Sequence, residues 1–202
     1  MKLYYAPGAC SLAVHIALRE SGRAFDLEKV DLRTKRTESG EDYSRINPKG
    51  SVPALKLDDG TVLTEASVCA QYVGDLAPQT DLVPIAGSME RYRLMEWMNF
   101  ISAEIHKTFG PFFEPGISAD LRERQTKLLE KRFAHVSAHL GQHRRLLGDK
   151  LTAADAYLFT VMRWTKIAKI DMSAWPALES YMKSIAEEPS VREAMKAEGL
   201  ST

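Results

Sequence analysis

The sequence predicts two domains, an α/β layer of about eighty residues followed by an all-helical domain. Three observations support this division. Short apolar runs alternate with helical patterns up to Leu76, a segment rich in Pro and Gly follows at 77–88, and no strand-like alternation comes after it. We place the α/β domain at residues 1–80, a linker at 81–87 and the helical domain at 88–202.

The α/β domain begins with the order strand, helix, strand. Lys2–Ala6 is predicted to be a buried strand, and Ser11–Glu20 a helix that ends at Gly22. The alternating pattern of Phe25–Asp31 indicates a second strand. The polar stretch Thr34–Asp42 is expected to be a loop or a short helix.

A hairpin and a helix complete this domain. Ala54–Leu57 and Val62–Leu63 flank the turn Asp58-Asp59-Gly60, which is the pattern of a β-hairpin. Glu65–Leu76 carries Val68, Tyr72 and Leu76 on one face and is predicted to be a helix.

The second domain is predicted to contain helices only. Its first helix is interrupted at Pro111 and Pro115, since proline lacks the backbone N–H that a helix interior needs. The predicted helices are Ser88–Phe109, Leu121–His143, Ala153–Ala168, Ala177–Glu187 and a short one near Val191–Glu198.

The composition argues against several classes of partner. Lys+Arg and Asp+Glu both total 27, so the basic excess of a nucleic-acid binder is missing. No apolar run approaches the ~18 residues of a membrane-spanning helix, and the apolar start is too short for a signal peptide. The two cysteines, Cys10 and Cys69, give neither a disulfide framework nor metal-binding spacing, so we expect a cytoplasmic protein.

Cys10 is the first candidate for chemistry, because it lies between the first strand and the first helix. A lone cysteine is most often packing, but a thiol at a helix N-terminus is favoured as thiolate. The small residues Pro7, Gly8 and Ala9 before it leave the sulfur open to a ligand. Ala13 stands where a dithiol motif has its second cysteine, so Cys10 would use an external thiol.

Two further segments are candidate binding elements. The Val52-Pro53 bond is either a trans bond that starts an edge strand or a cis bond. A cis bond would leave the backbone of Val52 facing a peptide-like ligand. Glu65 is either a first-turn acid or a ligand for an ammonium group, with the N–H groups of Ala66 and Ser67 binding a carboxylate.

Together these segments resemble the cytosolic glutathione transferases. The resemblance rests on the Cys10-Ser11 helix start, Asn47–Pro53, Leu63–Glu65 and the helical second domain, and it spans essentially the whole chain. Cys10 in place of the usual Tyr or Ser, the segment Asn99–Lys107 and the segment Leu147–Leu158 are similar to the bacterial beta class. The resemblance implies a thioredoxin-like N-terminal domain and an all-α C-terminal domain that bind glutathione as co-substrate.

The resemblance also implies residue roles. Cys10 and His106 would be catalytic, Cys10 meeting the glutathione sulfur and His106 pointing at it from the helical domain. A homodimer is implied because Asn99 and Glu104 match positions near glutathione held mainly by the partner subunit. The glutathione-binding residues implied are Cys10, Lys35, Val52, Glu65, Ala66, Asn99, Ala103, Glu104, His106 and Lys107. Ala66 departs from the Ser of many relatives, which removes a hydroxyl but keeps the N–H.

Several residues have structural interpretations instead. Thr152 and Asp155 form a capping-box pattern that opens a helix, and Pro53 shapes the turn before the hairpin. Cys69 is expected to pack in a helix. No metal site is expected. His135, His139 and His143 recur every four residues on one partly exposed helix face, but no thiol or carboxylate joins them. On its own helix His106 lies on a polar stripe that is usually solvated, and only the resemblance makes it a site residue.

Three functions are compatible with this pattern. The first is conjugation of glutathione to small hydrophobic electrophiles; the second is glutathione-dependent thiol–disulfide exchange or peroxide reduction through Cys10. The alternative is a non-catalytic protein that sequesters hydrophobic ligands. Phe112, Phe113 and Trp164 are candidates for the electrophile pocket, and the electrophile itself is not encoded in any motif.

Overall fold

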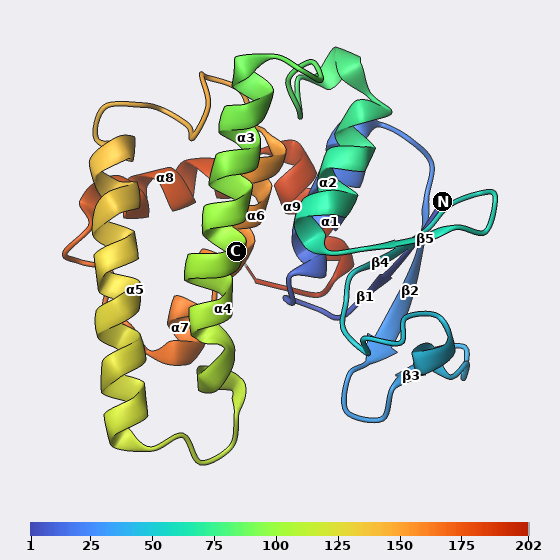
Figure 1. The fold of residues 1–202 in the computed structure, drawn as a ribbon, viewed down its shortest axis with the longest axis horizontal. Coiled ribbons are helices and arrows are strands. Elements are labelled where there is room, and N and C mark those ends of the chain that lie inside the picture. The colour runs from blue at the N-terminus through green and yellow to red at the C-terminus, as the bar shows by residue number, and fades with distance from the viewer. Residues whose placement is uncertain (202) are drawn as a thin grey trace.

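A five-stranded sheet forms the centre of the N-terminal domain (Figure 1). The structure, a computed structural model, describes residues 1–201. The sheet order is β3-β2-β1-β4-β5, with β1 parallel to β2 and antiparallel to β4. The strands are β1 (Lys2–Tyr5), β2 (Asp26–Asp31), β3 (Arg36–Thr37), β4 (Ala54–Lys56) and β5 (Val62–Thr64).

The predicted hairpin is confirmed, and one prediction in this domain is wrong. β4 and β5 pair antiparallel with Leu55 opposite Leu63. The stretch 34–42, predicted to be loop or short helix, contains strand β3, which pairs Thr37 with Val30 of β2. Lys35 makes the reversal possible with a positive φ of 55°, and two polar residues leave no alternation for a sequence pattern to detect.

The helices follow the predicted order with two differences. The segment predicted as one helix over 88–109 passes through a π-helical turn at Ile101–His106. The segment predicted over 153–168 is split, because the N–H of Trp164 bonds only three residues back to Val161 and tightens the chain. The helices are α1 (Ser11–Ser21), α2 (Ala66–Asp75), α3 (Met89–Phe100), α4 (Lys107–Phe109), α5 (Ala119–Leu140), α6 (Ala153–Met162), α7 (Thr165–Ala168), α8 (Pro176–Ala186) and α9 (Pro189–Ala197), with 3₁₀ turns at Tyr43–Arg45, Pro78–Thr80 and Gly110–Phe113.

Helix α1 joins the two domains. It packs against α2 on the sheet side and against α6 and α9 of the helical domain (Figure 1). Leu12, Ile16 and Leu18 are fully buried there, in one apolar cluster that continues through both domains. The predicted stop is confirmed, since Gly22 caps α1 with a left-handed φ of 67°. The domains therefore meet through a shared core.

The predicted linker is packed rather than free. Leu82 is fully buried, and its carbonyl accepts a hydrogen bond of 2.9 Å from the N–H of Ala153. A Cβ on Gly74 would lie 2.7 Å from Val83, so only glycine allows this approach of α2 to the linker. The limits 1–80, 81–87 and 88–202 stay a prediction. Over residues 1–201, none of the helices has both the length and the apolar character needed to cross a bilayer.

The capping box at the start of α6 is confirmed. Asp155 is fully buried and accepts hydrogen bonds from the N–H of Leu146, the N–H and hydroxyl of Thr152, and the hydroxyl of Tyr181. The carboxylate thus ties the helix start to the preceding loop and to α8.

Replacing Asp155 by Ala is expected to destabilise the protein by about 3 kcal/mol or more, because buried donors lose their acceptor. Thr152→Ala is expected to cost about 1 kcal/mol, the usual loss for an N-cap. Urea denaturation measures both, with the exposed Asp149→Ala as control. Equal stability of Asp155→Ala and Asp149→Ala would contradict the role of the box.

Candidate functional site

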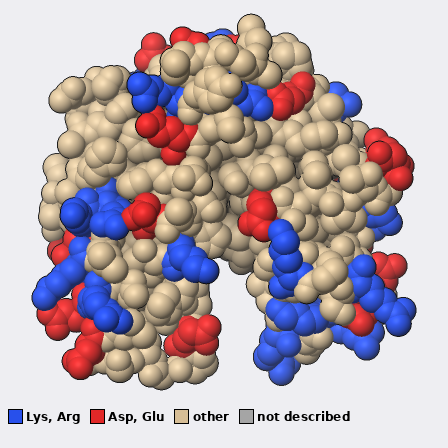
Figure 2. Space-filling model, in the orientation of Figure 1, with Lys and Arg blue, Asp and Glu red and all other residues tan. Residues whose placement is uncertain are grey.

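A cavity of about 430 Å³ contains Cys10 and lies between the two domains. Figure 2 shows the molecule hollowed between its two domains in this view. The lining residues are Cys10, Ser51, Val52, Pro53, Glu65 and Ala66 from the N-terminal domain, and Ser102, Ala103, His106, Lys107 and Tyr157 from the helical domain.

Cys10 stands at the start of α1 as a neutral thiol. Its Sγ donates a hydrogen bond of 3.0 Å to the carbonyl oxygen of Val52. Burial raises the pKa of the Cys10 thiol to about 12, and the charge of Glu65 acts in the same direction. The helix N-terminus acts in the opposite direction and favours the thiolate, but the cost of burying the charge exceeds this effect.

The Val52-Pro53 bond is cis, one of the two alternatives left open by the sequence. Ser51, which precedes this bond, is held by two hydrogen bonds. The hydroxyl of Tyr43 and the side-chain amide of Asn47 both donate to its carbonyl oxygen, at 2.8 and 2.7 Å. The main chain of Val52 thus borders the cavity at a defined position.

Helix α2 begins at the edge of the cavity. Glu65 precedes it with a φ of 72°, a conformation that costs a non-glycine residue about 1–3 kcal/mol and is often found at functional sites. No side chain caps the N-terminus of α2. The Glu65 carboxylate lies 2.6 Å from Nζ of Lys49 in an exposed pair. The first N–H groups of α2 are consequently suited to an anionic ligand.

His106 lines the same cavity from the π-helical turn. Its Nδ1 lies 2.7 Å from the hydroxyl of Tyr157, and its ring packs 4.8 Å from that of Trp164. Burial lowers the pKa of His106 to about 4, and burial raises the pKa of Tyr157. At neutral pH both groups are uncharged, so His106 carries a single ring N–H.

Most, but not all, predicted site residues meet in this cavity. Cys10, Val52, Glu65, Ala66, Ala103, His106 and Lys107 line it. Lys35, Asn99 and Glu104 do not. Lys35 donates to the carbonyl of Gly50 at 2.7 Å, Asn99 is exposed on α3, and Glu104 accepts from Nε of Arg132 at 3.0 Å.

Sequence reasoning missed three lining residues, Ser51, Ser102 and Tyr157, of which Ser51 directly precedes the predicted Val52. Ser102 stands four residues before His106, so the helical period was an available signal. Tyr157 lies in the segment that carries the capping box, and its side chain reaches the cavity only because α6 packs against the π-helical turn. No local pattern indicates that contact.

The aromatic candidates for an electrophile pocket lie beside the cavity. Phe113 and Trp164 meet edge to face at 5.2 Å, while Phe112 is buried. A neighbouring groove of about 660 Å³ shares His106 and Lys107 with the Cys10 cavity and runs along Pro111 and the loop before α5. An apolar substrate therefore has room next to His106.

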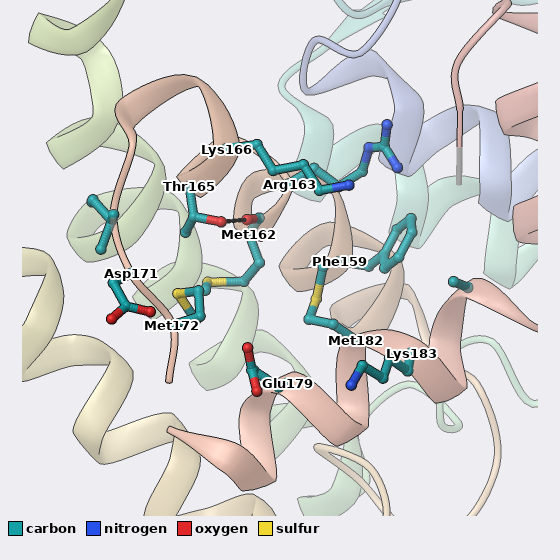
Figure 3. Close-up of a pocket in the computed structure, with 12 residues that line it drawn as sticks. Phe159, Met162, Arg163, Thr165, Lys166, Asp171, Met172, Glu179, Met182 and Lys183 are labelled. Carbon is teal, nitrogen blue, oxygen red and sulfur yellow. Dashed lines mark hydrogen bonds between the residues drawn. The ribbon is translucent and has the colours of Figure 1, made fainter. Parts of the chain in front are cut away.

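Another cavity, of about 440 Å³, lies between α6, α7 and α8 (Figure 3). Met162, Met172 and Met182 line it together with Phe159. It holds none of the predicted site residues. Charged side chains such as Arg163, Asp171 and Glu179 also line it, but the predicted site residues meet in the Cys10 cavity, which is why we take the latter as the candidate site.

The three histidines of α5 and the turn after it have structural contacts. His139 and His143 stack at 4.2 Å, and their ring nitrogens face the carbonyls of Leu146 and His139. His135 packs against Trp97. Within residues 1–201 no group of three or more His, Cys, Asp or Glu side chains is arranged to hold a metal ion.

Two family models match this chain. They are the glutathione S-transferase N-terminal domain, over residues 8–76, and the glutathione S-transferase C-terminal domain, over residues 100–189. Glutathione S-transferase GstA of Escherichia coli O157:H7 is 46% identical over 200 residues, which cover 99% of this chain and 100% of that protein. The chain belongs to the glutathione S-transferase family.

Solved structures place this transferase in the bacterial beta class. A beta-class glutathione S-transferase from Sphingomonas chungbukensis is 44% identical with a TM-score of 0.96, and each chain is covered to 100%. A sphingomonad glutathione S-transferase complexed with glutathione is 43% identical, with the same TM-score and coverage. The resemblance seen in the sequence motifs is confirmed, as is the thioredoxin-like domain joined to a helical domain.

The lowered pKa of His106 predicts a pH dependence of stability. An unfolded histidine has a pKa of about 6.5. Because the folded pKa is lower, the unfolded chain binds more protons between pH 6.5 and about 4, and stability falls as the pH drops through this range. Proton NMR of the ring, assigned with His106→Asn, should show titration well below pH 6. Titration at or above the unfolded value would contradict the buried neutral ring.

Proposed function

We propose that this transferase binds glutathione in the Cys10 cavity and conjugates it to small hydrophobic electrophiles. The observation that carries the proposal is that four groups suited to glutathione border the same cavity. The main chain of Val52, the uncapped start of α2, the thiol of Cys10 and the neutral ring of His106 all border one cavity of about 430 Å³. These are the groups that a peptide with a free carboxylate and a thiol requires.

Each part of glutathione has a suitable counterpart. The cysteinyl unit pairs with the backbone of Val52 as an added strand would. The γ-glutamyl carboxylate binds the N–H groups at Ala66, and its ammonium replaces Lys49 as the partner of Glu65. Lys35 binds the glycyl carboxylate after leaving the carbonyl of Gly50. Exposed pairs are weak, so these exchanges cost little.

The neutral Cys10 thiol is suited to donate a hydrogen bond. When the glutathione sulfur is ionised, the S–H of Cys10 turns from the carbonyl of Val52 to that sulfur. The neutral N–H of His106 supports the same charge or the leaving group from the other side. The glutathione sulfur then forms a bond to the electrophilic carbon, and the leaving group departs with its electron pair. Fixed donors of this kind stabilise developing charge.

The groove beside His106 is the site that we propose for the electrophile. It lies on the helical-domain side of the cavity, and the ring of Trp164 packs against His106, one of its lining residues. Its volume of about 660 Å³ accommodates a small aromatic or aliphatic molecule next to the sulfur.

Thiol–disulfide exchange is a second candidate activity. Cys10 is partly exposed, whereas Cys69 is fully buried. The Cys10 sulfur would attack a disulfide that contains glutathione, which breaks that S–S bond, releases the other half as a thiol and leaves glutathione joined to Cys10; a second glutathione then frees Cys10 and leaves as oxidised glutathione. The raised pKa of Cys10 disfavours this route at neutral pH, because the thiolate is the nucleophile. Two free thiols also support a cytoplasmic location.

Replacing Cys10 separates these activities. Cys10→Ala is expected to lower kcat for conjugation of a chlorodinitrobenzene about tenfold or more, the worth of a hydrogen bond to a charged group. Cys10→Ser keeps a donor and should retain most of the conjugation, while both variants lose disulfide exchange. Cys69→Ala is the matched control. Exchange that persists without Cys10 would overturn its role, and binding without any turnover by the intact protein would indicate sequestration.

We also propose a homodimer formed through α2 and α3. These helices leave large apolar side chains uncovered, since Val68, Met89, Tyr92 and Met95 are 46%, 65%, 56% and 44% exposed. The two helices are held side by side, since Arg91 donates to Gln71 and Asp75. In such a dimer Asn99 and Glu104 approach the site of the partner subunit.

Tyr92→Glu is expected to shift the protein from dimer to monomer, because a two-fold interface would bury the new charge twice. Sedimentation velocity measures the shift. Gln142→Glu adds the same charge at an exposed position after α5 and should stay dimeric. A monomeric wild-type protein at micromolar concentration would refute the interface.

A further inference from the structure

The loop that presents Cys10 is only partly held by its own hydrogen bonds. The hydroxyl of Ser11 bonds to both the N–H and the carbonyl of Ala6, at 3.2 and 3.3 Å, and the N–H of Ala9 donates to the same carbonyl at 3.0 Å. Gly8, at the tip of the loop, is different. Both of its backbone groups bond to side chains from the other end of the chain.

Two side chains of the helical domain form hydrogen bonds with the backbone of Gly8. Its N–H donates to Oε2 of Glu198 at 2.9 Å, and its carbonyl accepts from Nε1 of Trp164 at 2.8 Å. Gly8 has a φ of 71°, and a Cβ there would lie 3.5 Å from Leu200, so the backbone itself approaches the C-terminal segment. In Figure 1 this segment, at the end of α9, returns to the junction of the domains beside α1.

Glu198 is a buried carboxylate with a second donor. Its Oε1 lies 2.9 Å from Nδ1 of His15, and both side chains are 0% exposed. Arg19 donates from Nε to Nε2 of His15 at 3.3 Å, which leaves the ring proton on Nδ1, directed at Glu198. A buried carboxylate is tolerated only with such partners, so Glu198 has one defined orientation.

We propose that Glu198 is a positioning residue for Cys10. Its carboxylate, oriented by His15, fixes Gly8 and so sets the Cys10 loop against the helical domain. Trp164 binds the other side of Gly8 and packs against His106, so the same clamp fixes Cys10 relative to His106. This inference rests on the proposed role of Cys10, and it adds a residue that does not line the cavity.

Glu198→Gln is the first test, because it keeps the shape and loses one acceptor. The amide must turn its NH₂ toward Gly8 or His15, both of which are donors. We expect kcat for conjugation to fall about 10- to 100-fold, as for small misplacements of a catalytic group. The KM for glutathione should stay within about twofold, because Val52 and the start of α2 are untouched.

Two controls separate positioning from lost stability. Val191→Ala removes buried contacts from the same helix α9 without touching Gly8, and should keep kcat at an equal or larger loss of thermal stability. His15→Asn retains an N–H near the Nδ1 position and should keep kcat, while His15→Phe fills the space without a donor and should lower it. This second pair decides the question if Glu198→Gln does not fold.

The outcomes that overturn the proposal are specific. If wild-type conjugation depends on Cys10 and Glu198→Gln matches Val191→Ala in kcat, or His15→Phe matches His15→Asn, Glu198 does not position the loop. If the Cys10→Ala variant conjugates with the same kcat as the wild-type protein, the role proposed for Cys10 is wrong, and this inference fails with it.

Discussion

Burial of α1 between the sheet and the helical domain is the constraint on which the structure depends. The helix contacts α2, α6 and α9, and each of its fully buried Leu and Ile side chains contributes about 1.5–3 kcal/mol to folding. Its N-terminus carries Cys10, so the same packing that joins the domains places the thiol at their junction. The cavity exists because two other elements, the Val52 segment and the π-helical turn, end at this point.

Burial also decides the electrostatics of the site. It raises the pKa of Cys10 and lowers that of His106, so that both groups are neutral where a helix end and a polar stripe would suggest charge. Two neutral donors around a ligand sulfur avoid the repulsion that a protein thiolate would cause. The site is therefore built to stabilise a charge that arrives with the ligand.

Local chemistry was predictable from the sequence, and long-range contacts were not. The stop at Gly22, the hairpin before Val62 and the capping box of Thr152 each depend on residues close together in the chain, and all three are confirmed. Strand β3 was not predicted, because its two polar residues are too few to show the alternation of apolar and polar side chains that indicates a strand. The protonation of Cys10 depends on how deeply the fold buries it, which no neighbouring residue encodes.

The residues of the site also fall into those that a local sequence pattern indicates and those that only the fold brings in. Motifs that border the cavity, such as the cis bond before Pro53 and the start of α2, have local signatures. Tyr157 lines the cavity, and Glu198 contacts Gly8 in the loop before Cys10; both come from far along the chain, through the packing of α6 and α9. Their roles follow only from the folded structure.

A crystal structure of the protein with glutathione tests the central claim most directly. We expect glutathione in the Cys10 cavity, with its cysteinyl backbone paired to Val52, its γ-glutamyl carboxylate at the N-terminus of α2 and its sulfur within hydrogen-bond distance of Cys10 Sγ. Glutathione bound elsewhere, for example in the methionine-lined cavity between α6 and α8, or bound without contact to Val52, would contradict it.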